Sequence, residues 1–391
     1  MLKLIMYRRR LPSRVAFIKK KSVIRILFIT TEVRGWKGLP LYLKMLDNPR
    51  FEPVIGVGTN PKYPEAQYEL INYLKQRNFS YYDFNNPNLS IDSVNPDFVI
   101  YDGPYEDAYP RNLRFSNNLN QVFLGCDYCI NTTKHIVHLD HPWYDYCWQF
   151  YVEHEDVAKR KREILGSRAR NIKVTGVPIQ DELLLPKENF EDPWIDKSGK
   201  KRIIYAPHHS FKGVNGDGIE FATFLDYGEV MLEFAEKYSD YITIAFKPHP
   251  FLYIRLLKIW GKQRTDSYYQ RWSDLQNTQF ENGEYLGLFK YSDAIIHDSA
   301  SFIVEYLYID KPSMFLLADS NNIDDMFDYV KECYYSHEHG YNKEDIETFI
   351  ENVIKGVDNK HEQRHNCIIH NLMPPNGATA CENIINMILK G

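Results

Sequence analysis

Three strand-like segments in the second half of the chain each end at histidine. The exits of IIYAP, ITIAF and DAIIH carry His208 and His209, Lys247 and His249, and His297 and Asp298. Carboxyl ends of neighbouring parallel strands meet at one edge of a sheet, which is where open α/β sheets bind their ligands. We therefore expect the three exits to form one site, although a single histidine at a strand end is more often a packed side chain.

His249 stands between two prolines, Pro248 and Pro250. Proline fixes its own φ angle and pushes the preceding residue toward extended geometry. The imidazole is thus expected in stiff backbone, either as part of an ordinary strand-to-helix turn or aimed at a ligand.

The turn Asp298, Ser299, Ala300 and Ser301 lies between the third strand and SFIVEYLYI, which we expect to be helical. A helix N-terminus exposes unpaired N–H groups, and small hydroxyl residues let a phosphate approach them. The turn is a candidate phosphate site, and Ser299 or Ser301 could equally be the N-cap. Glu305, one turn further on, is a candidate ribose ligand or a solvated helix residue.

A second group of histidines lies in the first half, in HIVHLDHPW. His138 and His141 flank Asp140, and a carboxylate beside a histidine can fix its tautomer for general-base catalysis. A metal cluster with His135 fits the pattern less well, because a strand places residues three apart on opposite faces. We expect no metal site. The lack of G-x-G-x-x-G and GKS or GKT loops argues against dinucleotide oxidoreduction and P-loop hydrolysis.

Strands and helices alternate in both halves of the chain, which predicts two doubly wound domains with mostly parallel sheets. The expected strands are 24–32, 51–59, 96–104, 134–143, the start of 149–166, 171–178, 201–207, 241–246, 291–300 and 311–317. The expected helices are 38–48, 64–78, the rest of 149–166, 228–240, 251–275 and 301–309. We expect domains over 24–180 and 201–391, joined by a linker over 181–200.

The N-terminal segment over 1–23 is basic. The first 31 residues contain nine Lys and Arg and no acid, although the formal net charge of the chain is −5. The segment also contains apolar residues, which suits an anionic membrane surface, and a disordered arm is the alternative. It lacks the uninterrupted apolar stretch of a signal peptide, and the acidic remainder of the chain argues against nucleic-acid binding.

Six cysteines in 391 residues indicate reduced thiols, and the lone Cys126–Cys129 pair lacks a second pair at zinc-site spacing.

Several of these segments resemble the CDP-glycerol glycerophosphotransferase family of teichoic acid and capsule synthesis. The similar elements are VTGVPIQDELL, YAP, FKPHP and YSDAIIHDSASFIVEYLYIDKPSMFL, in that order. The resemblance implies a GT-B fold, with two Rossmann-like domains and a ligand cleft between them. It also implies that 24–180 is the acceptor-side domain and that 201–391 binds the nucleotide donor.

The resemblance implies roles for individual residues as well. His249 would contact the donor phosphates, the turn from Asp298 to Ser301 would hold the pyrophosphate, and His141 would be the base, with His138 as the second choice. The chain departs from the family pattern in three places: His208, His209 and Ser210 replace Thr-Trp-Arg, Ala300 replaces a serine, and Pro142 replaces a glycine.

We therefore predict a transferase that moves a polyol phosphate from a CDP-linked donor to an acceptor hydroxyl in surface polymer synthesis. The donor is the only nucleotide expected, without a separate cofactor, and the acceptor is a polymer or a lipid-linked molecule. The expected location is the cytoplasmic face of the membrane. One alternative is a GT-B glycosyltransferase with a nucleotide-sugar donor, and another is a binding or scaffold protein.

Overall fold

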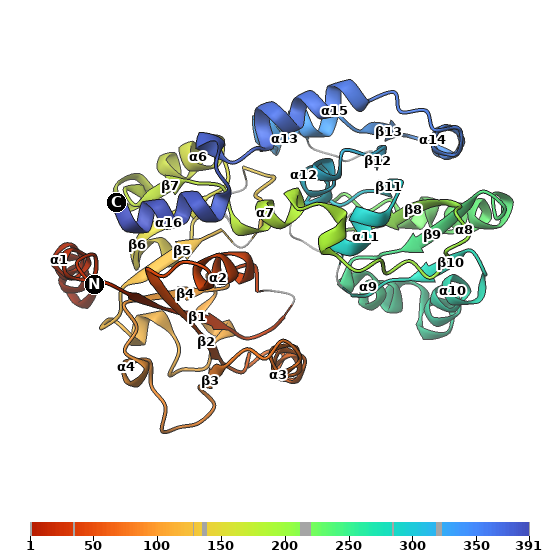
Figure 1. Ribbon diagram of the computed structural model, residues 1–391. Helices are drawn as coiled ribbons and strands as arrows, with labels where there is room; N and C mark the ends of the chain where they lie inside the picture. Colours follow the sequence, from red (N-terminus) through yellow and green to blue (C-terminus); the bar gives the residue numbers. More distant parts are fainter. Residues whose placement is uncertain are drawn as a thin grey trace. The chain divides into compact units, whose positions relative to one another are not determined.

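The computed structural model describes residues 2–33, 36–127, 129–134, 139–211, 220–283, 285–317 and 323–390. The chain divides into two compact units, unit 1 with Met1–Glu182 and Pro374–Gly391, and unit 2 with Leu183–Met373. Each unit contains one parallel sheet with helices packed against it (Figure 1). The predicted α/β class, with two doubly wound domains, is confirmed.

The sheet of unit 1 has seven strands in the order β3-β2-β1-β4-β5-β6-β7. The strands are β1 (Ile24–Thr30), β2 (Phe51–Val57), β3 (Tyr81–Asp83), β4 (Phe98–Tyr101), β5 (Phe123–Cys126), β6 (Cys147–Val152) and β7 (Ile172–Val174). Because β1 pairs with β2 on one side and with β4 on the other, the strand order reverses between β1 and β4. Doubly wound sheets bind ligands outside such a reversal, which is called the switch point.

The helices of unit 1 use the apolar spacing seen in the sequence. They are α1 (Leu2–Ile18), α2 (Leu39–Leu46), α3 (Ala66–Gln76), α4 (Ile91–Val94), α6 (Glu155–Leu165), α7 (Pro178–Leu184), which runs into unit 2, and α16 (Ala380–Lys390). Short 3₁₀ turns are η1 (Glu106–Ala108), η2 (Phe115–Asn117), η3 (Pro142–Asp145), η4 (Gly166–Ala169) and η9 (Pro375–Gly377). In α1 the buried residues recur every three or four positions, at Tyr7, Leu11, Val15 and Ile18.

The sheet of unit 2 has six strands in the order β10-β9-β8-β11-β12-β13, with its switch point between β8 and β11. The strands are β8 (Lys201–Ala206), β9 (Ile242–Phe246), β10 (Thr278–Phe280), β11 (Ala294–His297), β12 (Ser313–Leu316) and β13 (Glu338–Gly340). Alternate residues of β8 enter different cores, Ile203 and Tyr205 on one face and Ile204 and Ala206 on the other. This alternation is the two-residue period of a strand that is buried on both faces.

The helices of unit 2 pack on both faces of its sheet. They are α8 (Phe224–Lys237), α9 (Pro250–Trp260), α10 (Lys262–Asp274), α11 (Leu286–Tyr291), α12 (Phe302–Glu305), α13 (Asp328–Tyr335), α14 (Lys343–Lys355) and α15 (His361–Cys367). The shorter helical turns are η5 (Lys187–Asn189), η6 (Tyr306–Ile309), η7 (Ile323–Asp325) and the π-helix η8 (Ile368–Leu372).

Several predicted elements differ from the structure. The expected strand over 134–143 is wrong for its described part, because Pro142 begins η3 and the strand that follows β4 in the chain is β5, at Phe123–Cys126. The expected helix over 301–309 is one α-turn, α12, followed by the 3₁₀ turn η6. The expected helix over 251–275 is interrupted at Gly261, which has φ 76° and joins α9 to α10.

The two ends of the chain also differ from the predicted organisation. The basic segment is the helix α1, and its Tyr7 hydroxyl donates to the Tyr146 carbonyl at 2.7 Å. The last helix, α16, belongs to unit 1 and not to the second domain, because Asp181 accepts hydrogen bonds from the N–H groups of Ala380 and Cys381 at 2.7 and 2.8 Å. No helix among the described residues is long and apolar enough to cross a bilayer.

Candidate functional site

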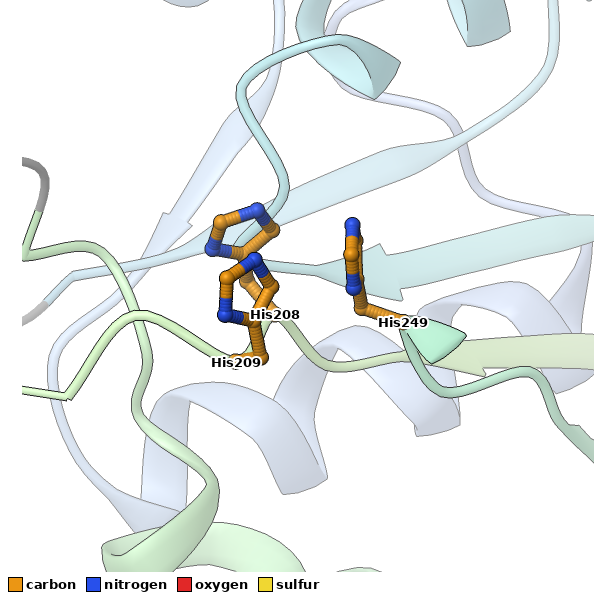
Figure 2. Close-up of side chains that lie close together, drawn as sticks. All are labelled: His208, His209 and His249. Atoms are coloured by element: carbon orange, nitrogen blue, oxygen red, sulfur yellow. The ribbon is translucent and has the colours of Figure 1, made fainter. Parts of the chain in front are cut away.

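Three histidine rings lie together at the exits of β8 and β9, beside the switch point of unit 2. His208 and His209 follow β8, and His249 follows the neighbouring strand β9 (Figure 2). The ring centroid of His249 is 4.9 Å from that of His208 and 4.1 Å from that of His209. One nitrogen from each ring lies within 4.8 Å of the others. The sequence expectation that these exits converge is correct for the three histidines.

The backbone at the site is held by bonds between the strand exits. The N–H of His249 donates to the Pro207 carbonyl at 3.0 Å, which joins the β8 and β9 exits. His249 is also the N-cap of α9, because its Nδ1 accepts the N–H of Phe251 at 3.1 Å. The two flanking prolines and this cap fix the direction of the ring.

Asp298 connects the third exit to the first. Its carboxylate accepts the backbone N–H of His208, and it accepts the N–H and hydroxyl of Thr223 at 2.6 and 2.8 Å. The side chain is fully buried, and burial raises its pKa to about 6. We conclude that Asp298 positions the His208 loop, since its carboxylate is directed at protein donors.

All three histidines of the cluster are partly buried, and two have altered pKa values. Burial, followed by repulsion from His209 and Lys247, lowers the pKa of His249 to about 3. Burial and the other two histidines hold the pKa of His208 well below its usual range. Both rings are therefore neutral at pH 7 without a ligand.

Hydrogen bonds fix which nitrogen carries the proton in two of these rings. A backbone N–H can only donate, so Nδ1 of His249 is an acceptor and Nε2 carries the proton in the neutral ring. Nδ1 of His208 likewise accepts the N–H of Ser210 at 3.3 Å. A metal ion needs a lone pair at the ligating nitrogen, so these tautomers fit a metal poorly. They suit an anion, to which Nε2–H groups can donate.

The other predicted donor-side residues occupy different positions around this edge. Ser299 and Ser301 have their hydroxyl oxygens 3.3 Å apart in the turn before α12. His297 is fully buried with Nδ1 3.2 Å from the Ser299 carbonyl, so its ring lies under the turn. Glu305 is only 6% exposed inside α12. The remaining two, Lys247 and Ala300, are partly exposed at the exits of β9 and β11.

The predicted acceptor-side histidines are in unit 1. His138 and His135 lie outside the described residues. His141 precedes η3, its ring meets Tyr105 edge-on at 4.9 Å, and burial lowers its pKa. Its Nδ1 is buried without a hydrogen-bond partner among the described residues, and Asp140 is paired with Arg168 at 2.8 Å instead. Asp140, the carboxylate that was expected to orient His141, thus forms an ion pair with Arg168.

Sequence reasoning missed a row of carboxyl groups at the strand exits of unit 1. Asp102 follows β4, Asp127 follows β5 and Glu153 follows β6. Burial raises the pKa of Asp102 to about 6, and burial together with Asp127 raises the pKa of Glu153 to about 8. Asp102 and Glu153 lie at the ends of apolar segments that the sequence predicts as strands, and this position is the signal that would have found them.

Residues 129–390 match the family model of the CDP-Glycerol:Poly(glycerophosphate) glycerophosphotransferases. The chain belongs to this family. The predicted family resemblance is therefore confirmed, and the match covers all of unit 2 but begins after β5 of unit 1.

Two curated proteins are similar to this chain in sequence. The teichoic acid ribitol-phosphate polymerase TarK of Staphylococcus aureus (strain NCTC 8325 / PS 47) is 31% identical over 177 residues, which are 43% of this chain and 31% of TarK. TarL of the same strain is 28% identical over 175 residues, 43% of this chain and 29% of TarL. The matched region spans less than a third of either relative.

Solved structures support the fold. The wall teichoic acid polymerase TagF, in a structure soaked with CDPG, aligns with 99% of this chain and 96% of its own, with a TM-score of 0.58 and 12% identity. The UDP-GlcNAc 2-epimerase of Neisseria meningitidis aligns with 94% of this chain and 100% of its own, with a TM-score of 0.60 and 16% identity. Both comparisons support a GT-B-like fold of two Rossmann-like domains.

Proposed function

We propose that this protein transfers a polyol phosphate, such as glycerol phosphate, from a CDP-linked donor to an acceptor hydroxyl in the synthesis of a teichoic-acid-like polymer. Membership of the glycerophosphotransferase family supports the reaction class. The observation that carries the proposal is the cluster of His208, His209 and His249 at the exits of β8 and β9, beside the switch point of unit 2. Neutral imidazoles with protonated Nε2 atoms suit the oxygens of a diphosphate.

In the proposed reaction the acceptor oxygen attacks the β-phosphorus of the donor and the bond from that phosphorus to the bridging oxygen breaks. CMP leaves with the electron pair, and the product is a phosphodiester. His249 and His208 donate hydrogen bonds to the phosphate oxygens, where negative charge accumulates in the transition state. Asp298 and Thr223 keep the His208 loop in place for this task.

A donor-binding experiment tests the role of the cluster. The His249→Ala variant is expected to bind CDP-glycerol about 10- to 150-fold more weakly, because a hydrogen bond to a charged group contributes about 1.5–3 kcal/mol. His370→Ala, which changes an exposed histidine of the same unit, is the matched control. Calorimetric titration gives the affinities, and equal affinity in both variants would remove the donor role of the cluster.

The nucleotide that the wild type releases tests the reaction itself. Incubation with CDP-glycerol or CDP-ribitol and a polyol-phosphate acceptor is expected to release CMP, measured by ion-exchange chromatography. Acceptor-dependent release of UDP from a UDP-sugar, without release of CMP from either CDP-linked donor, would instead favour a glycosyltransferase.

Attachment to an anionic membrane surface through α1 is part of the proposal. The helix packs on unit 1 through Tyr7, Leu11 and its other buried residues, and it leaves Arg9, Arg10 and Phe17 exposed. Basic groups beside an exposed aromatic ring suit an interface with anionic lipid. We expect co-sedimentation with phosphatidylglycerol vesicles and not with phosphatidylcholine vesicles. Replacing Arg9 and Arg10 by Gln should abolish it, and unchanged binding would count against α1.

A further inference from the structure

The switch point of unit 1 carries a carboxylate that no sequence motif assigned. Asp102 follows β4, next to Thr31, which follows β1, and the residue as a whole is only partly buried. Strand exits on either side of a switch point line the ligand crevice of a doubly wound sheet. Asp102 precedes residue 129, where the family match begins, so its role does not follow from that match.

The Asp102 carboxylate has a fixed direction. One oxygen accepts the Tyr109 hydroxyl, and the other accepts the N–H of Thr31 at 3.3 Å. The Tyr109 oxygen in turn accepts the N–H of Gly103 at 2.9 Å, so the tyrosine is itself held in place. A carboxylate that is held in a fixed direction by donors and lines a cavity has the geometry of a general base.

A small cavity adjoins this carboxylate. It has a volume of about 20 Å³ and is lined by Asp102, Cys126 and Asp127 from the exits of β4 and β5, and by Lys37 and Gly38 before α2. That volume holds about one water molecule or one hydroxyl group. The crevice thus offers room for a hydroxyl beside a carboxylate.

We propose that the switch-point crevice of unit 1 binds the reacting hydroxyl of the acceptor and that Asp102 is its general base. The proposal rests on the proposed function for the identity of the reaction. The hydroxyl of a polyol lies in the cavity and its proton passes to a carboxylate oxygen of Asp102 as the oxygen–phosphorus bond forms. CMP leaves from the phosphorus, and Asp102 then returns its proton to water.

The protonation behaviour of Asp102 suits this task. Burial raises its pKa to about 6, while hydrogen bonds from Thr30, Tyr109 and the Thr31 N–H oppose the rise and the charge of Glu32 adds to it. The other titratable residues that line the cavity are Lys37, Tyr101, Cys126, Asp127 and Tyr151. The carboxylate is therefore ionised at pH 7 and yet more basic than an exposed aspartate.

Substitution of Asp102 gives the first test. In Asp102→Asn, acceptor-dependent release of CMP is expected to fall about 10²- to 10⁴-fold, the usual contribution of a general base, while calorimetric affinity for CDP-glycerol stays unchanged. Asp47→Asn, at an exposed aspartate at the end of α2, is the matched control. Circular dichroism melting verifies that both variants fold. Wild-type transfer in Asp102→Asn would overturn the proposal.

Tyr109→Phe gives a second test, and its expected result would not arise if Asp102 had a purely structural role. Removal of the Tyr109 hydroxyl takes away a bond that lowers the Asp102 pKa, so the acid limb of the pH–rate profile should move to higher pH. An unmoved limb, with loss of transfer in His141→Gln instead, would assign the base to His141. If the wild type releases UDP instead of CMP, the proposed donor is wrong, but the same variants still test the base, because a glycosyl acceptor hydroxyl must also lose its proton.

Discussion

Glu153 is expected to make the stability of unit 1 depend on pH in the neutral range. Its side chain is 5% exposed, and Oε1 accepts the N–H and Nδ2 of Asn131 at 2.5 and 2.9 Å, whereas Oε2 has no hydrogen-bond partner among the described residues. The buried cation Lys161, which lies nearby, is bonded to Asp127 at 2.9 Å. Burial and the Asp127 charge raise the pKa of Glu153 from 4.5 to about 8.

The sign and size of the effect follow from this shift. A carboxyl whose folded pKa is raised stabilises the fold fully below its unfolded pKa, and this contribution is lost as the pH rises through the folded value. With a folded pKa of about 8, raising the pH from 7 to 9 costs about 1.4 kcal/mol of unfolding free energy. Glutamine has the shape of the protonated side chain and does not titrate. Glu153→Gln should therefore escape this loss.

Scanning calorimetry at pH 7 and pH 9 measures the difference. The melting temperature of the wild type should fall by about 3–6 °C more than that of Glu153→Gln, because about 1 kcal/mol corresponds to about 2–4 °C for a unit of this size. Glu69→Gln, at an exposed glutamate of α3, should behave as the wild type. Equal losses in the wild type and in Glu153→Gln would refute a neutral Glu153 at pH 7.

Three further outcomes are expected. Lys161→Met leaves the buried Asp127 charge without its ion pair and should lower the free energy of unfolding by about 3–5 kcal/mol in urea denaturation. Gly125→Ala places a methyl group against the Phe150 ring in β6 and should cost about 1–3 kcal/mol in the same assay, with an unchanged value arguing against this packing. EDTA should leave the affinity for CDP-glycerol unchanged because Nε2 of His249 is protonated, and a loss restored by Zn²⁺ would contradict the tautomer.

The sequence predicted the parts of the fold that depend on strong local patterns. Long apolar runs such as 24–30 and 242–246 are interior strands of the two sheets, and the helices α2 and α3 lie within their expected ranges. The strands that were missed are short. β3, β10 and β13 have three residues each, too few for a period to show. The strand β5 was missed for a related reason, since its four residues include Gly125.

In the candidate site, too, the sequence pattern predicted some features, whereas others depend on tertiary packing. Histidines at neighbouring strand exits were predicted to meet because parallel strands end at one edge, and His208 and His249 do so. The direction of each side chain depends on tertiary partners that the sequence does not reveal. Asp298 is directed at Thr223, and His297 lies under the Ser299 turn, although both were expected to contact phosphate. Asp102 was passed over because its partner Tyr109 lies in an irregular loop.

The two switch points have the same topology and opposite chemistry. In unit 2 the exits present neutral imidazoles, and hydrogen bonds from Phe251 and Ser210 leave Nε2–H free to donate to an anion. In unit 1 the exits present carboxyl groups, and Asp102 can accept a proton. Transfer of a phosphoryl group to a hydroxyl requires both functions, since charge develops on phosphate oxygens while the hydroxyl loses its proton. This difference supports our proposal that the anionic donor binds at the edge of the unit 2 sheet and that the acceptor hydroxyl binds at the edge of the unit 1 sheet.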